Sequence, residues 1–94
     1  MDPTARMIAM NSSLSHVALL VRNAEASAKF LNSHGIETED PEVFESEGTK
    51  EIYVGSYGTQ SGLLLLLEAI SDGPYKRALE KRGPSLHHIA IDVL

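Results

Sequence analysis

Two histidines stand at the same place in two segments of nearly the same sequence. Residues 14–21 read LSHVALLV and residues 86–93 read LHHIAIDV, so His16 and His88 each fall third in the segment, followed by a β-branched residue and alanine. The chain contains no cysteine, so any metal ion must be bound by histidine or carboxylate side chains. The repeated histidine is therefore the strongest functional indication in the sequence.

The first of these segments is predicted to be a strand that leads into a helix. Residues 14–21 are rich in Val and Leu, as strands are. Asn23 can cap the helix, whose apolar residues recur at helical spacing until Gly35 ends it. Side chains alternate along a strand, and we expect the helix to cover the face that carries Val17, opposite His16.

Three more strands are predicted before the second copy of the histidine segment. An acidic, proline-containing connection leads into an exposed edge strand at 43–46. Residues 50–55 alternate in polarity so that Glu51 shares a face with Tyr53. Five consecutive leucines at 63–67 indicate a strand that is covered on both faces.

A second helix precedes the repeated segment. Asp72, Gly73 and Pro74 open it, and Gly83 followed by proline ends it. The predicted fold is of the α+β class, with one βαβββ module followed by a helix and the first strand of an incomplete second module. The predicted domain map is a flexible N-terminal lead at 1–12 and a single domain at 13–94, with the βαβββ module at 14–70 and the helix and strand at 73–94.

Composition limits the classes of function. Eight Lys and Arg residues against thirteen Asp and Glu give a formal charge of -5 over 94 residues, which disfavours nucleic acid as the main partner. The N-terminal segment lacks the apolar run of a secretory signal, and the leucine run is too short to cross a bilayer. We expect a cytoplasmic protein that binds a small molecule, with no membrane partner and no organic cofactor.

Several segments together resemble one known superfamily. They are HVALLV, GTKEIYV, LLLEA, ALEKRG and LHHIAIDV, and they extend over nearly everything after residue 13. In order and spacing they are similar to the vicinal oxygen chelate superfamily of glyoxalases, dioxygenases and epimerases, and within it to methylmalonyl-CoA epimerases. The resemblance implies two modules side by side, whose curved sheets enclose a cavity.

The resemblance also implies a divalent metal ion held by the first and last strands of each module. His16 and His88 match the ligand positions of the two first strands, and strand alternation allows only one of His87 and His88 to face the cavity. The fourth-strand ligand position falls at Leu65, which cannot coordinate a metal, and the remaining ligand, a glutamate, is expected beyond residue 94. The alternative is that both histidines face the cavity and are hydrogen-bonded to polar neighbours or water.

Glu51 matches, by the same resemblance, the catalytic glutamate that moves the proton α to a thioester carbonyl. A carboxylate in a semi-enclosed pocket has a raised pKa, which makes it a more competent base near neutral pH. The alternative is an exposed glutamate beside Lys50. The second helix carries half of the cations of the chain, which can meet the phosphates of a coenzyme A-like substrate or form a solvated face. These cations are Lys76, Arg77, Lys81 and Arg82.

Three functions remain open at this point. The first is a lyase or isomerase of the glyoxalase or methylmalonyl-CoA epimerase type, which acts on an acyl-CoA thioester or an oxo compound through Glu51 and a metal near His16 and His88. The second is a metal-free module in which the same cavity binds an apolar small molecule. The third is a half-module that functions only after assembly, and we expect a homodimer because one module leaves a strand edge uncovered.

Overall fold

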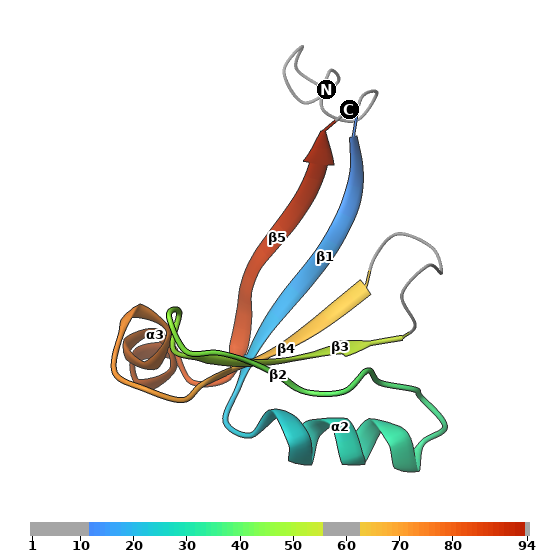
Figure 1. The fold of residues 1–94 in the computed structure, drawn as a ribbon, viewed down its shortest axis with the longest axis horizontal. Coiled ribbons are helices and arrows are strands. Elements are labelled where there is room, and N and C mark those ends of the chain that lie inside the picture. The colour runs from blue at the N-terminus through green and yellow to red at the C-terminus, as the bar shows by residue number, and fades with distance from the viewer. Residues whose placement is uncertain (1–11, 56–62, 94) are drawn as a thin grey trace.

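The computed structural model describes residues 12–55 and 63–93, which form one sheet and two helices. The strands lie in the order β2-β3-β4-β1-β5, and Figure 1 shows α2 along one side of the sheet and α3 beside the start of β5. This arrangement confirms the predicted α+β class and the βαβββ order followed by a helix and a strand. The elements are β1 (Ser12–Val21), α2 (Ala24–Ser33), β2 (Glu42–Phe44), β3 (Thr49–Val54), β4 (Leu63–Ala69), α3 (Pro74–Arg82) and β5 (Ser85–Val93).

The two histidine-bearing strands are direct neighbours in the sheet. β1 pairs in antiparallel fashion with β5 and in parallel fashion with β4, and Figure 1 shows β1 and β5 as two long strands side by side. The strands β2, β3 and β4 continue the sheet through antiparallel pairs. Because β1 lies between β4 and β5, residues from both ends of the chain meet on one surface.

Helix α2 packs on the face of the sheet that the strand pattern predicts. Its buried residues Ala24 and Ala28 form a core cluster with Ile52 of β3 and Leu66 of β4, and Leu66 pairs with Leu19 of β1. Leu19 lies on the same face as Val17 because they are two residues apart on one strand. The side chains of His16 and Glu51 therefore belong to the opposite face.

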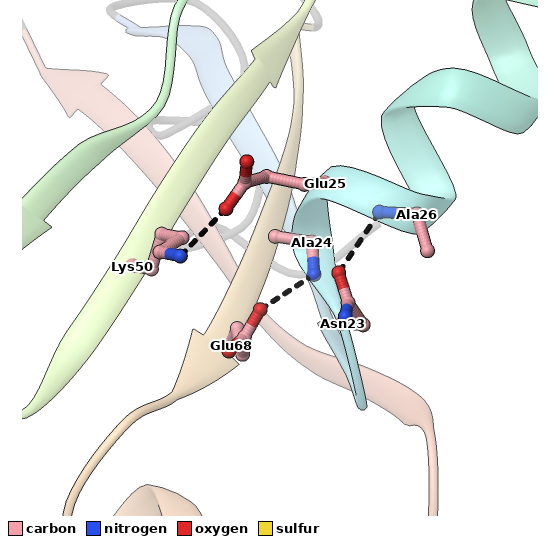
Figure 2. A network of polar contacts seen from close by, with 6 residues as sticks. All are labelled: Asn23, Ala24, Glu25, Ala26, Lys50 and Glu68. Carbon is pink, nitrogen blue, oxygen red and sulfur yellow. Dashed lines mark hydrogen bonds and ion pairs between the residues drawn. The ribbon is translucent and has the colours of Figure 1, made fainter.

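The first turn of α2 is held by two side-chain acceptors (Figure 2). Asn23 accepts a hydrogen bond from the backbone N–H of Ala26 at 2.9 Å, as expected of an N-cap residue. Glu68 of β4 accepts one from the backbone N–H of Ala24 at 2.7 Å through Oε1. The carboxylate also stands at the positive end of the helix dipole. Glu68 thus joins the start of the helix to the sheet.

Replacing Glu68 by alanine (Glu68→Ala) is expected to lower the free energy of unfolding by about 1–3 kcal/mol, because the buried N–H of Ala24 loses its acceptor. The matched variant Glu68→Gln keeps an acceptor oxygen and loses only the charge, at a cost of about 0.3–1 kcal/mol. Urea unfolding of both variants measures the difference. Equal losses for the two would show that the charge, not the hydrogen bond, carries the effect.

The observed boundaries differ from the expected ones by a few residues. β1 begins at Ser12 and β4 extends to Ala69, because the sheet pairing continues past the residues that the local pattern marks. The edge strand is Glu42–Phe44 rather than 43–46, since the next four residues form a turn. Leu65, Leu66 and Leu67 are buried, which confirms the covered leucine strand. Residues 1–11, which make up most of the expected lead, and residues 56–62 lie outside the described part.

Neither helix in the described part is both long and apolar enough to cross a membrane.

Candidate functional site

The candidate site lies on the face of the sheet opposite α2. Its floor is set by the register of four strands, in which Tyr53 pairs with Leu65, Leu65 with Ala18, and Ala18 with His88. Paired residues share a face, so these side chains form one row across the sheet. Glu51 lies on the same face, two residues before Tyr53 on β3.

His16 and His88 meet on this face near the sheet edge formed by β1 and β5. Their Nε2 atoms are 3.3 Å apart, and their rings cross at 72° with centroids 5.4 Å apart. His16 also lies edge-on to Tyr53, with ring centroids 5.8 Å apart, and its Nδ1 is 3.2 Å from the hydroxyl of Ser15. The pairing of β1 with β5 therefore brings together the two histidines that the sequence repeat marks.

A β-bulge changes the expectation for His87. The partner of Ala18 is His88, whereas the next residue of β1, Leu19, pairs with Leu86, so His87 is an extra residue in β5. The Nδ1 atoms of His87 and His88 are 2.8 Å apart. The expectation that only one of the two faces the site rests on alternation, which the bulge interrupts. The choice of His88 stays a prediction, and its contact with His16 supports it.

His87 connects the histidine pair to α3. Its ring lies 4.9 Å from the ring of Tyr75, measured between centroids. Burial lowers the pKa of His87, and His88 and Arg82 lower it further by charge repulsion. A depressed imidazole pKa favours the neutral form, which can both donate and accept a hydrogen bond. No pattern in the sequence predicts this contact, because it depends on the bulge.

Glu51 is half-buried, and its environment differs from that of an exposed surface glutamate. Its Oε2 accepts a hydrogen bond from the hydroxyl of Thr49 at 3.1 Å. Burial is the largest cause that raises the pKa of Glu51. The Thr49 hydrogen bond lowers this pKa, the nearby Glu47 and Glu42 raise it, and His88 lowers it. The charge interaction with His88 places Glu51 in the same electrostatic environment as the histidine pair.

Lys50, the sequence neighbour of Glu51, points to the other face of the sheet. Its Nζ forms an ion pair with Glu25 of α2 at 2.6 Å, as Figure 2 shows. This pair raises the pKa of Lys50 and lowers that of Glu25. The side chains of Glu51 and Lys50 thus lie on opposite faces, and Glu51 has intermediate exposure. The catalytic role of Glu51 stays a prediction.

The floor of the site is apolar and limits metal binding. Leu65 and Leu20 are buried, and a leucine side chain has no atom that can bind a metal. The 3.3 Å spacing of the two Nε2 atoms matches two nitrogens on one tetrahedral zinc, about 3.3 Å for Zn–N bonds of about 2.0–2.1 Å. Across residues 12–55 and 63–93, no group of three or more His, Asp or Glu side chains is arranged to hold a metal. The described residues thus fit two ligand positions and do not complete a site.

Helix α3 has no buried residue and presents its cations to solvent. Lys76 pairs with Asp72 at 3.2 Å, one turn earlier, with both side chains exposed. Lys81 and Arg82 lie in the last turn, where they face the negative end of the helix dipole. These features agree with a solvated cationic face.

The geometry of the sheet is that of a known fold, the vicinal oxygen chelate fold. Solved methylmalonyl-CoA epimerases superimpose on the chain with this arrangement of strands and helices. The enzyme from Mycobacterium tuberculosis is 22% identical, covers 86% of this chain over 55% of its own length, and gives a TM-score of 0.74. No family model matches the sequence, and no curated protein matches it.

Several of the similar structures contain acyl-CoA ligands. A methylmalonyl-CoA epimerase in complex with methylmalonyl-CoA and NH4+ is 26% identical, with 86% of this chain and 60% of that chain covered and a TM-score of 0.74. A variant of the Streptomyces coelicolor methylmalonyl-CoA epimerase in complex with 2-nitronate-propionyl-CoA gives the same four values, 26%, 86%, 60% and 0.74. The chain thus spans less than two thirds of the length of the structures that it matches.

Proposed function

We propose that this chain transfers a proton at the carbon α to the carbonyl of an acyl-CoA thioester or a related oxo compound, with Glu51 as the base. One observation carries the proposal, which is that a half-buried carboxylate with a raised pKa lies on the same sheet face as His16 and His88. The solved epimerases with acyl-CoA ligands support the choice of substrate class.

The proposed chemistry follows from the groups on this face. The carboxylate of Glu51 removes the α proton, and the electron pair of the C–H bond moves into an enolate. An imidazole N–H of His16 or His88 can donate a hydrogen bond to the enolate oxygen, where negative charge develops. The carboxyl proton of Glu51 exchanges with solvent, and transfer of a solvent-derived proton back to the carbon completes the isotope exchange. Inversion of the centre would require a second acid on the opposite face of the carbon, which is not part of this proposal.

A divalent metal is a separate part of the proposal. His16 and His88 would provide two imidazole ligands, and Leu65 provides none. The remaining donors would have to come from a second copy of the chain or from outside the described residues. When bound, such an ion supplies Lewis-acid stabilisation of an enolate. Metal analysis of protein purified without chelator, compared with His16→Ala, tests this proposal, and equal metal content in the two would contradict it.

Deuterium exchange tests the proton transfer itself. The chain is incubated with methylmalonyl-CoA in D2O, and the incorporation of deuterium at the α carbon is followed by mass spectrometry against a protein-free control. We expect incorporation of one deuterium per thioester well above the spontaneous rate. Incorporation at the spontaneous rate, at protein concentrations where the thioester binds, would overturn the proposal.

A metal-free binding module is the second candidate, and the apolar floor favours it. Leu65 pairs with Ala18, which pairs with His88, so this face has an apolar residue where a metal centre needs a donor. Thermal shift measurements distinguish the candidates. Stabilisation by apolar ligands without any exchange activity would favour the module, whereas strong stabilisation by divalent metals alone would count against it.

We also propose that the chain forms a homodimer through the face and free edge of β5. Within the described residues β5 pairs on one edge only, and it contains neither Lys nor Pro, which commonly protect an edge strand. Leu86, Ile89 and Ile91 are about half exposed on this strand. Leu86 pairs with Leu19, which lines an apolar groove of about 460 Å³ beside α2. A two-fold pairing of β5 with β5 would cover the strand edge.

The dimer is tested by light scattering at increasing concentration. We expect the wild-type chain to have twice the monomer mass, and Ile89→Lys to shift the mass toward the monomer because it places a charge in the interface. The same substitution at an exposed residue away from β5, Ile36→Lys, is the control. A wild-type chain that stays monomeric at high concentration would contradict the proposal.

A further inference from the structure

Thr49 is a buried polar residue whose hydroxyl donates a hydrogen bond to Glu51. It is fully buried, and within the described ranges no other buried residue carries a polar or charged side chain. Every buried side-chain nitrogen or oxygen in that part of the chain has a hydrogen-bond partner. For the Thr49 hydroxyl, this partner is Oε2 of Glu51 at 3.1 Å. The hydroxyl thus meets the requirement that a buried polar group be hydrogen-bonded.

Packing alone does not explain threonine at this position. Thr49 lies in β3 opposite Ala69, and valine has nearly the same shape and also favours strands. Burying a hydroxyl instead of a methyl group costs free energy unless a hydrogen bond compensates. The compensating bond here goes to the carboxylate that is the proposed base.

The strand geometry makes this contact local and directional. Thr49 and Glu51 are two residues apart on β3, so their side chains leave the sheet on the same face. A glutamate side chain has three rotatable bonds, and a hydrogen bond from a rigid, β-branched neighbour restricts them. With Oε2 held by Thr49, Oε1 is the remaining oxygen for a substrate proton.

We propose that Thr49 is a positioning residue, whose hydroxyl fixes the carboxylate of Glu51 for proton transfer. This inference rests on the proposed function of Glu51 and adds to it the residue that holds the base. The groups that influence the pKa of Glu51 lie on three parts of the sheet. They are Thr49 on its own strand, Glu42 and Glu47 around β2, and His88 on β5. Of these, Thr49 alone is a neutral donor in direct contact.

Two substitutions separate the hydroxyl from the shape. Thr49→Val removes the hydroxyl and keeps the volume, and Thr49→Ser keeps the hydroxyl and removes a methyl group. The hydrogen bond from Thr49 lowers the pKa of Glu51, so Thr49→Val is expected to raise that pKa and Thr49→Ser to leave it near the wild-type value. The pKa is read from the carboxyl carbon of labelled Glu51 by NMR, with Glu51→Gln to assign the signal.

The exchange rate gives the second readout. Thr49→Val is expected to lower the rate of α-deuterium exchange roughly tenfold, which corresponds to the loss of one hydrogen bond, and Thr49→Ser is expected to restore most of it. Ile52→Val, which removes one methylene from a buried residue on the other face of β3, is the packing control and should change neither readout.

The Glu51 pKa and the exchange rate of these variants decide whether Thr49 positions the carboxylate. An unchanged Glu51 pKa in Thr49→Val, or the same shift in Thr49→Ser as in Thr49→Val, would overturn it. If the wild-type chain shows no exchange at all, the proposed function fails, whereas the NMR titration still decides whether Thr49 holds the carboxylate.

Discussion

Replacing Glu51 by glutamine (Glu51→Gln) is expected to lower the rate of α-deuterium exchange by about 10²–10⁴-fold, the usual contribution of a positioned general base. The amide has the shape of the carboxylate and keeps an oxygen that can accept the hydrogen bond from Thr49. It cannot accept the substrate proton at neutral pH. The measurement is the initial rate of deuterium incorporation into methylmalonyl-CoA at equal protein concentrations.

The melting temperature of Glu51→Gln shows whether activity is lost because the base is missing or because the protein unfolds. The pKa of Glu51 is raised in the folded state, mainly by burial, so the folded chain disfavours the charged form. The associated stability is present below the unfolded pKa and is lost as the pH rises through the folded pKa. At neutral pH the wild-type carboxylate carries this cost and the amide does not. Glu51→Gln should therefore melt at or above the wild-type temperature.

Glu42→Gln is the matched control for the charge. Glu42 lies opposite Glu51 in the β2-β3 pair and is exposed, so its substitution removes a negative charge near the site without removing the base. We expect an exchange rate close to that of the wild type. An equal loss of activity in both variants would show that local charge, rather than the proposed base, controls the rate.

Replacing Ile52 by alanine (Ile52→Ala) is expected to lower the free energy of unfolding by about 2–5 kcal/mol. Ile52 is 1% exposed and forms the core cluster beneath α2 with Ala24, Ala28 and Leu66. The truncation leaves a cavity, and the small side chains of Ala24 and Ala28 on the helix cannot fill it. A domain of this size has a total stability of about 5–15 kcal/mol, so the loss is a large fraction. Urea unfolding monitored by circular dichroism measures it.

Ile36→Ala provides the comparison for the same chemical change at the surface. Ile36 is 42% exposed in the connection after α2, and its truncation should cost about 1 kcal/mol or less. Similar losses at the two positions would contradict the assignment of the core to the α2 face of the sheet.

The element order was predictable because it depends on local patterns. The cap at Asn23, the helical spacing that follows it and the leucine run at 63–67 each indicate one element without reference to the rest of the chain. The repeat marked His16 and His88, and the sheet places them side by side. Their roles in metal binding, and that of Glu51 in catalysis, stay predictions.

The contacts that were not predictable depend on pairing across the sheet. The bulge at His87 arises from the register between β5 and β1, which no local pattern encodes. Glu68 reaches the helix start only because β4 ends beside it. Thr49 reads as an ordinary strand residue in the sequence, and its role is visible only from its burial and its contact with Glu51.

The pH dependence of the exchange rate tests most directly whether Glu51 in its charged form is the base. The rate is measured for the wild type and for Glu51→Gln under identical conditions, from acidic pH to neutrality. We predict that the wild-type rate rises with pH through a single pKa above the usual glutamate value, in the direction that burial imposes, and then levels off. Glu51→Gln should show no such rise. A wild-type rate that does not change over this range, or the same rise in Glu51→Gln, would contradict the assignment.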